Sequence, residues 1–120
     1  MIDHVNIGVA DLATSRAFYE RALASLGYAV LMDMPYGVGF GRDGKPAFWI
    51  SDRPTSAPLH VAFASPDRAT VDTFHREGLA AGGRDNGPPG LRPQYHASYY
   101  GAFVLDPEGN NVEAVTHMPE

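Results

Sequence analysis

The chain of 120 residues contains no cysteine, so disulfide bonds and thiolate chemistry are both excluded. No apolar run approaches the roughly 18 residues of a membrane-spanning helix, and the N-terminus has no signal-peptide pattern. Positive charge is scarce, because 9 lysines and arginines stand against 14 acidic residues and leave a net charge of −5. A deficit of this sign argues against nucleic acid and anionic membranes as partners. We therefore expect a cytoplasmic protein that contacts neither.

What is present is an ordinary globular composition, with 44% hydrophobic and 19% charged residues. The length suits one domain over residues 1–120. Near the start, "DHVNIGVA" alternates, with Val5, Ile7 and Val9 on one face and His4 on the other. This alternation predicts a strand with one buried face. A helix should follow over residues 12–26, with Asp11 as its N-cap and Gly27 as its stop.

The chain repeats this plan 56 positions later. Four pairs of identical residues share that offset: His4 and His60, Asp11 and Asp67, Phe18 and Phe74, and Gly27 and Gly83. The first copy continues with strands near 28–34, 37–41 and 46–51, the last two joined by a hairpin turn at "RDGK". In the second copy, residues 83–98 are rich in glycine and proline, and we expect a long loop there that acts as a lid or specificity loop. Strands near 99–105 and 110–116 close the chain.

The repeat predicts the fold class. We expect an α+β protein of two tandem βαβββ modules, about 1–53 and about 57–117, forming a curved mixed sheet around a concave site.

Glu113 lies in the apolar segment "NNVEAV", and an unpaired carboxylate on a buried sheet face would cost several kcal/mol. Strand parity places His4 and His60 on the faces opposite the apolar, helix-facing residues. We expect Glu113 to face the same concavity. Two histidines and one carboxylate that converge form a set that binds a divalent ion and leaves positions open for substrate.

The offset between the two copies grows near their ends, since Gly44 and Gly109 are 65 positions apart. With this offset, Phe48 is the counterpart of Glu113. We therefore expect Phe48 on the concave wall, where it would give the cavity an apolar side for a substrate with a hydrocarbon or aromatic body.

These residues resemble the vicinal oxygen chelate superfamily, which includes glyoxalase I, bleomycin-resistance proteins, fosfomycin-resistance transferases and extradiol dioxygenases. The resemblance covers essentially the whole chain. It rests on His4, on the helix "DLATSRAFYERAL", on the second histidine in "LHVAF", and on "DPEGNNVEAV", which matches the family ending D-P-x-G-N-x-x-E.

The resemblance implies that His4, His60 and Glu113 bind one divalent metal ion, with Fe2+, Mn2+, Zn2+ and Ni2+ as the alternatives. Glyoxalase I enzymes add a fourth, acidic ligand on the last strand of the first module. The offset puts Phe48 there, and an apolar ring neither binds a metal nor moves a proton. Glyoxalase I activity is therefore not expected. The three-ligand pattern is similar to that of the dioxygenases and fosfomycin transferases.

Other residues are candidates for chemistry and recognition. His96, Tyr99 and Tyr100 are candidates for proton transfer, because an imidazole titrates near neutrality and a phenol donates to a developing anion. Arg92 and Tyr95 are candidates for substrate binding, together with Phe48. Each also has a plain structural interpretation, as a loop or packing residue.

We expect a metal-dependent enzyme that polarises a small substrate through two adjacent oxygens, with a dioxygenase-like reaction favoured. A metal-dependent lyase, isomerase or transferase is one alternative. A metal-free, bleomycin-resistance-like protein that binds a small molecule is the other. The linker "SDRPTSAP" is short and contains two prolines, which favours holding the halves apart. We therefore expect a homodimer in which each site takes His4 from one chain and His60 and Glu113 from the other.

Overall fold

The computed structural model describes residues 2–55 and 58–120. The expected start of the second module, near residue 57, lies outside the described residues. The elements of the first half are β1 (Val5–Val9), α1 (Leu12–Ala22), a short 3-10 helix (Ala24–Leu26), β2 (Ala29–Met34), β3 (Gly37–Arg42) and β4 (Lys45–Asp52). The second half contains β5 (His60–Ala64), α2 (Arg68–Ala80), β6 (Arg84–Leu91), β7 (Tyr100–Leu105) and β8 (Asn111–Thr116).

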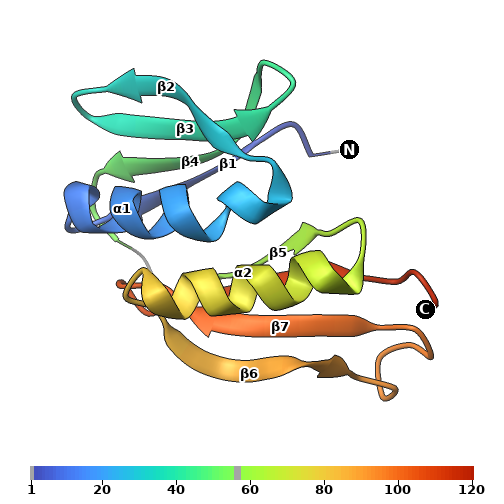
Figure 1. Ribbon diagram of the computed structural model, residues 1–120. Helices are drawn as coiled ribbons and strands as arrows, with labels where there is room; N and C mark the ends of the chain where they lie inside the picture. The colour runs from blue at the N-terminus through green and yellow to red at the C-terminus, as the bar shows by residue number, and fades with distance from the viewer. Residues whose placement is uncertain (1, 56–57) are drawn as a thin grey trace.

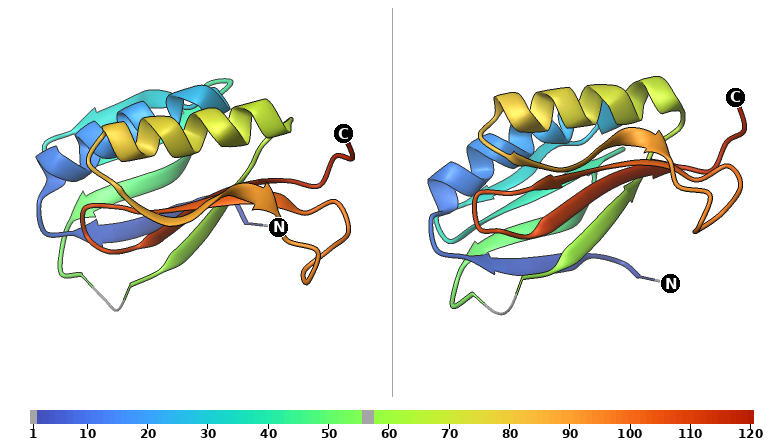
Figure 2. Two further views of the ribbon diagram at one scale, coloured as in Figure 1. Left: turned by 60° about the horizontal axis from the view of Figure 1, so that its bottom comes forward. Right: turned by 90° about the horizontal axis from the view of Figure 1, so that it is seen from below.

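Each half forms its own four-stranded mixed sheet. The strand orders are β1-β4-β3-β2 and β5-β8-β7-β6, so the two sheets have the same topology. β1 runs parallel to its neighbour β4, and β5 runs parallel to its neighbour β8. The other neighbouring pairs in both sheets are antiparallel. Both helices lie on the same side of the two sheets, next to each other (Figures 1 and 2). The predicted α+β fold of two tandem βαβββ modules is confirmed.

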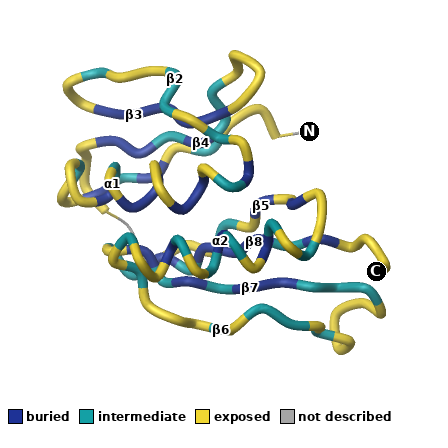
Figure 3. Tube along the Cα trace, in the orientation of Figure 1, coloured by how far each residue is buried: buried dark blue, intermediate teal, exposed yellow. Residues whose placement is uncertain are grey.

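Strand parity decides which face of each sheet is buried. In β1, Ile7 and Val9 are buried and face the core, whereas Asn6 is exposed on the opposite face. In β5, Phe63 is buried, whereas His60 lies on the exposed face. The helix-facing side chains of both sheets join one hydrophobic core. Figure 3 shows long exposed stretches along strands β2 and β6, which have no buried residue and lie at one edge of each sheet. Each sheet therefore presents a second, open face away from the helices.

Short-range chemistry explains the ends of the elements. Asp11 and Asp67 cap the two helices, with their carboxylates accepting from Thr14 N at 3.1 Å and from Thr70 N at 2.8 Å. The expected hairpin turn at "RDGK" has positive φ at both central residues, 55° at Asp43 and 76° at Gly44. That pair of angles defines the type of turn that Asp-Gly favours between antiparallel strands. No helix in residues 2–55 and 58–120 is both long and apolar enough to cross a membrane.

The expected long loop is wrong in its first half, because residues 84–91 form strand β6. The glycine and proline content misled the prediction. Pro88 and Pro89 are tolerated because β6 is an edge strand, and the register against β7 shifts at Gly87. What remains of the loop is the segment 92–99 between β6 and β7.

The placement of Phe48 is also wrong, by one residue. Val5 pairs with Phe48 in the first sheet, and its counterpart Val61 pairs with Val112 in the second. The true offset between β4 and β8 is therefore 64 (from 48 to 112), and Trp49 is the counterpart of Glu113. The error arose because Gly44 and Gly109 lie in turns of different construction, and the pairing of β3 with β4 contains a bulge. Phe48 is 2% exposed and packs in the core, where it borders a different hollow, of about 540 Å³, that His60 also lines.

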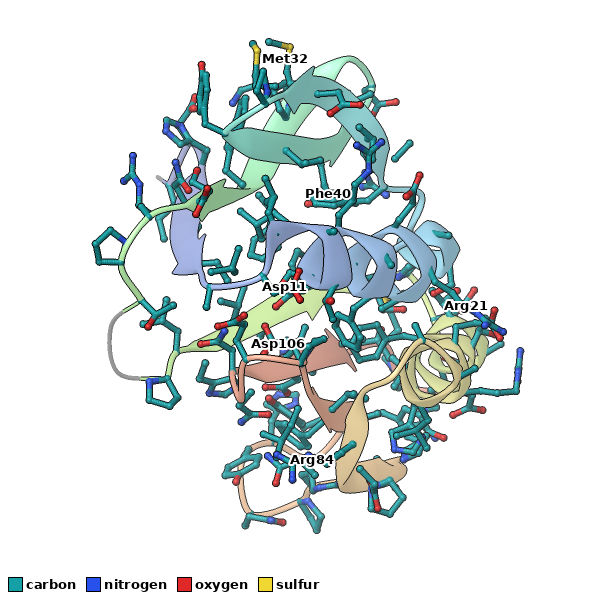
Figure 4. The ribbon with its side chains drawn as sticks, turned by 90° about the vertical axis from the view of Figure 1, so that its left-hand side faces the viewer. Asp11, Arg21, Met32, Phe40, Arg84 and Asp106 are labelled. Atoms are coloured by element: carbon teal, nitrogen blue, oxygen red, sulfur yellow. The ribbon has the colours of Figure 1, made fainter. Side chains whose placement is uncertain are left out.

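A buried polar contact ties the two halves together. The Tyr19 hydroxyl, on α1, donates to Asp106 in the turn before β8. Asp106 is only 2% exposed and also accepts from Asn110 N at 2.8 Å and Glu108 N at 2.9 Å. Burial, together with the Asp106 carboxylate, raises the pKa of Tyr19 well above its usual value, so the phenol keeps its proton. Figure 4 shows Asp106 close to Asp11, the N-cap of α1. The Asp11 N–H donates to Glu108 Oε2, in the same turn as Asp106.

This contact predicts the effect of Tyr19→Phe. The substitution leaves one lone pair of a buried carboxylate without its donor, so the free energy of unfolding should fall by about 1–3 kcal/mol. Chemical denaturation measures it. Tyr36→Phe is the control, since Tyr36 is 64% exposed. Equal stability of the two variants would contradict the role of the contact.

Candidate functional site

Glu113 lies in the middle of β8 and is almost completely buried, at 1% exposed. Its carboxylate nevertheless points to the open face of the second sheet, where two other side chains meet it. His60 Nε2 lies 2.8 Å from Glu113 Oε1, and the Tyr99 hydroxyl donates to Glu113 Oε2. Both carboxylate oxygens therefore have a hydrogen-bond partner, which offsets the cost of burying the charge.

Neighbouring strands bring these three residues together. His60 is the first residue of β5, which runs parallel to β8 with Ala62 directly opposite Glu113. Tyr99 immediately precedes β7, the other neighbour of β8. Parity along β7 puts Tyr99, Gly101 and Phe103 on one face. Phe103 is the residue directly opposite Glu113.

Gly101 makes room for the cluster. A Cβ at this position would lie 3.1 Å from Glu113 Oε2 and 3.2 Å from a ring carbon of Tyr99. Both distances are tighter than ordinary van der Waals contact. The absence of a side chain at Gly101 therefore lets the carboxylate and the phenol meet above the backbone of β7.

The phenol of Tyr99 is a proton donor at neutral pH. Burial, and then the hydrogen bond to Glu113, raise the pKa of Tyr99 to about 12. The proton that Tyr99 shares with Glu113 is therefore retained through the physiological range.

The cluster opens into a pocket of about 400 Å³. Its lining residues are His60, Tyr95, Tyr99, Phe103 and Glu113. A second hollow of about 300 Å³ shares Tyr95 and Phe103 and extends to Asn86, Arg92 and Asn111. The Arg92 guanidinium lies over the Phe103 ring, 5.4 Å from its centroid, and donates to the Pro88 carbonyl at 2.7 Å. The result is a groove with a carboxylate at one end, aromatic rings in the middle and a cation at the other end.

The third expected ligand, His4, lies elsewhere in the chain. Its ring is exposed on the open face of the first sheet, with Nδ1 2.7 Å from Asp3 Oδ1. It lines a separate pocket that contains neither His60 nor Glu113. Within the part of the chain that the structure describes, no three histidine, aspartate or glutamate residues come together as a metal-binding group.

Two of the residues expected to transfer protons lie away from the carboxylate. His96 is exposed in the 92–99 loop, where Nδ1 accepts from Ser98 N at 3.2 Å. Tyr100 is on the other face of β7, and its hydroxyl donates to Asp72 Oδ1 of α2 at 2.6 Å. Only Tyr99, among the three candidates, contacts Glu113. The structure also places two unpredicted residues at the site, Gly101 and Phe103, and the signal for both was their spacing of two and four residues from Tyr99.

The His60–Glu113 pair has the geometry of two neighbouring metal ligands. Two ligand atoms about 2.1 Å from one ion, at right angles, lie about 3 Å apart. The Nε2 and Oε1 atoms are 2.8 Å apart, and both border the pocket. An imidazole nitrogen and a carboxylate oxygen form a mixed set that suits several divalent ions. The pair therefore fits as part of a metal site. Within the described residues of one chain, however, the set of metal ligands is incomplete.

Comparisons with known proteins agree with this architecture. A family model described as Glyoxalase/Bleomycin resistance protein/Dioxygenase superfamily matches residues 1–114. The chain is similar to the crystal structure of a glyoxalase/bleomycin resistance protein from Albidiferax ferrireducens T118, with a TM-score of 0.84 and 29% identity over 99% of both chains. A putative glyoxalase from Bacillus halodurans has a TM-score of 0.74 and 24% identity, covering 97% of this chain and 95% of that one. A lactoylglutathione lyase from Agrobacterium tumefaciens has a TM-score of 0.72 and 21% identity, covering 97% and 92%. These last two support the fold alone. No curated protein matched the chain.

The packing at Gly101 predicts a change in the titration of Tyr99. In Gly101→Ala the new methyl group should separate the Tyr99 phenol from Glu113, so the pKa of Tyr99 should fall from about 12 toward 10, its ordinary value. Ultraviolet difference titration measures this. Subtracting the curve of the same protein with Tyr99→Phe isolates the single phenol. An unchanged Tyr99 transition in Gly101→Ala would show that the glycine does not hold the cluster.

Proposed function

The chain belongs to the Glyoxalase/Bleomycin resistance protein/Dioxygenase superfamily, and we propose that it is a divalent-metal-dependent enzyme acting on a small substrate with two adjacent oxygens. One observation carries the proposal. A buried carboxylate and an imidazole nitrogen stand 2.8 Å apart on the wall of an open pocket. A hydrogen-bonded pair that only stabilises the fold does not have to border a pocket of this size, whereas a pair that binds an ion and a substrate does.

His4 of a second copy would complete the ligand set. Within one chain, His4 lies on the open face of the first sheet, whereas His60 and Glu113 lie on the open face of the second. A two-fold dimer that brings these faces together would make two equivalent sites, each with two histidines and one carboxylate. Two-fold dimers are also the commonest soluble oligomers. The proposed partner is therefore an identical chain.

The chain's own residues have distinct roles in this proposal. The ion, when bound, would polarise the two substrate oxygens as a Lewis acid. Tyr99 holds its proton at neutral pH and donates it to Glu113. Were Glu113 to bind the ion instead, this single proton would be free to stabilise negative charge on a substrate oxygen. Phe103 and Tyr95 would flank an apolar or aromatic substrate body. Arg92, at the far end of the groove, would contact an anionic substituent.

A dioxygenase-like reaction with Fe2+ remains the favoured reaction class, with a lyase, isomerase or transferase reaction at Mn2+, Zn2+ or Ni2+ as the alternative. Glyoxalase I activity is still not expected with the corrected strand register. The residue at the position of the fourth, acidic ligand is Trp49 instead of Phe48. An indole supplies neither a carboxylate ligand nor a base.

A metal-free binding protein is the second candidate, and a specific observation favours it. Glu113 already has protein hydrogen-bond partners at both oxygens, His60 and Tyr99. The buried carboxylate is thus accommodated by the chain itself. In this case the groove from Glu113 to Arg92 would hold a small molecule without turnover.

Metal binding separates the two candidates. Wild-type protein, purified without a chelator or a metal-binding tag, should hold one divalent ion per site. Glu113→Gln removes the only charged ligand and should weaken binding about 100-fold or more, because even the loss of an outer-shell partner costs 10- to 100-fold. Glu20→Gln, at an exposed position on α1, is the matched control. Elemental analysis and isothermal titration calorimetry measure both. If wild type binds no ion, and its melting temperature ignores chelator and added ions, the metal-free binding protein is the function that stands.

Complementation tests the shared site. His4→Ala and Glu113→Ala homodimers should each lack a complete ligand set. After joint refolding, about half of the dimers are mixed by random pairing, and each mixed dimer should regain one intact site. Stoichiometric metal binding by the mixture, set against the two parents, measures this. Demonstrated subunit exchange without any recovery of metal binding would mean that the ligands come from a single chain.

A further inference from the structure

The open face of the first sheet carries a pocket of about 400 Å³, of which the proposed function uses only His4. Its lining includes His4, Asn6, Lys45, Trp49, Ser51 and Arg53. Lys45 is the only lysine of the chain and Trp49 the only tryptophan. This is also the face that corresponds, through the repeat, to the Glu113 face of the second sheet.

The pocket carries positive charge in a protein with a net charge of −5. Lys45 Nζ lies 2.8 Å from Asp3 Oδ1, so Asp3, which does not line the pocket, offsets part of the lysine charge. Arg53 forms no ion pair with any carboxylate of residues 2–55 and 58–120. The pocket and its immediate neighbour Asp3 therefore have a net charge of about +1 when His4 is neutral.

The remaining polar groups also favour a ligand that accepts hydrogen bonds. Ser51 Oγ donates to Asn6 Oδ1 at 2.8 Å. This bond uses one lone pair of the Asn6 amide oxygen and leaves the N–H groups of the amide as donors. The ammonium of Lys45 and the guanidinium of Arg53 have donors only. Lys45 Nζ already donates to Asp3 Oδ1 at 2.8 Å and to the Pro46 carbonyl at 3.0 Å, so a bound anion would compete with these two acceptors at Lys45.

Trp49 supplies an aromatic surface to the wall of the pocket. Trp49 is opposite Gly39 in the pairing of β3 with β4. A Cβ on Gly39 would lie 2.9–3.0 Å from three atoms of the indole, so the ring lies directly against the backbone of β3. Val38 and Phe40, on either side of Gly39, point to the core. The glycine therefore lets the indole approach the backbone of β3 closely, and Trp49 also lines the pocket.

We propose that this pocket binds the carboxylate of a flat aromatic acid, with the carboxylate at Lys45 and Arg53 and the ring stacked on Trp49. Aromatic stacking on a tryptophan face and charge-assisted bonds to a lysine and an arginine act together here. The proposal rests on the proposed function in one respect, because His4 lines this pocket and is also a ligand of the shared metal site. The carboxylate bound here would then belong to the same substrate molecule whose two oxygens bind at the proposed metal site.

Benzoate is the probe, and benzamide is its neutral analogue of the same shape. Because Trp49 is the only tryptophan, its fluorescence reports on this pocket alone. In chelator-treated wild type at fixed ionic strength, benzoate should change the emission saturably and bind at least about tenfold more tightly than benzamide. Equal affinity for the two compounds, or no saturable response, overturns the proposal.

Four variants at Lys45, Arg53 and Asp3 test the role of these charges, and the expected changes in benzoate affinity go in opposite directions. Lys45→Met and Arg53→Met should each weaken benzoate binding about tenfold, whereas Lys45→Arg should retain it. Asp3→Asn should strengthen it several-fold, because it removes the carboxylate that competes for Lys45. Arg76→Met, which removes one positive charge from an exposed position on α2, is the control and should have no effect. If Lys45→Met and Arg53→Met weaken benzoate binding no more than Arg76→Met does, the assignment is overturned.

Glu113→Gln, measured in parallel, separates this proposal from the proposed function. It should lose metal binding and keep the benzoate response. If wild type binds no metal while benzoate binding depends on Lys45 and Arg53, the proposed function fails and the anion pocket stands. If Glu113→Gln abolishes the benzoate response, the anion binds at the second sheet and the pocket assignment is overturned.

Discussion

The second sheet is organised around the burial of one carboxylate. A charge removed from water costs several kcal/mol unless its oxygens are hydrogen-bonded, and Glu113 is 1% exposed. β5 supplies His60 and the start of β7 supplies Tyr99, so the two neighbours of β8 each provide one partner. The lack of a side chain at Gly101 is a steric condition for this arrangement. The hydrogen bond to Glu113 adds to the burial that raises the pKa of Tyr99.

The two halves keep one topology but have exchanged the sizes of paired residues. Phe103 is opposite Glu113 in the second sheet, and Gly39 is opposite Trp49 at the corresponding place in the first. In one sheet the larger aromatic side chain is on the third strand, and in the other it is on the fourth. The exchange moves the aromatic surface from one strand to its neighbour and removes the acid from the first half. The two halves thus share their backbone pairing and differ in the side chains of their open faces.

The sequence predicted most of the fold because its signals were local and periodic. Alternation in the first strand of each half assigned His4 and His60 to the open faces, and aspartates before both helices marked their starts. Phe48 was misplaced because strand parity has a period of two, so an error of one position in a turn reverses the predicted face. Strand β6 was missed because Pro88 and Pro89 are typical of loops, and only its position at the sheet edge makes them compatible with pairing.

The choice among His96, Tyr99 and Tyr100 depended on where β7 begins, which no local pattern defined. Only the structure shows that Tyr100 turns to Asp72 on the helix side and that Tyr99 meets Glu113. The separation of His4 from His60 is likewise a matter of how the two halves pack, since sequence parity assigns a face but not the distance between two faces.

The division of chemistry between the two open faces gives the proposed dimer a physical reason. The second sheet offers a carboxylate, an imidazole and a phenol, which would serve the proposed metal site, whereas the first offers cations, amide donors and an indole. Neither face alone has three metal ligands within the described residues. A substrate with two chelating oxygens and an anionic aromatic body needs both sets of groups. In the proposed dimer, pairing the two faces across the two-fold axis supplies both sets at one site.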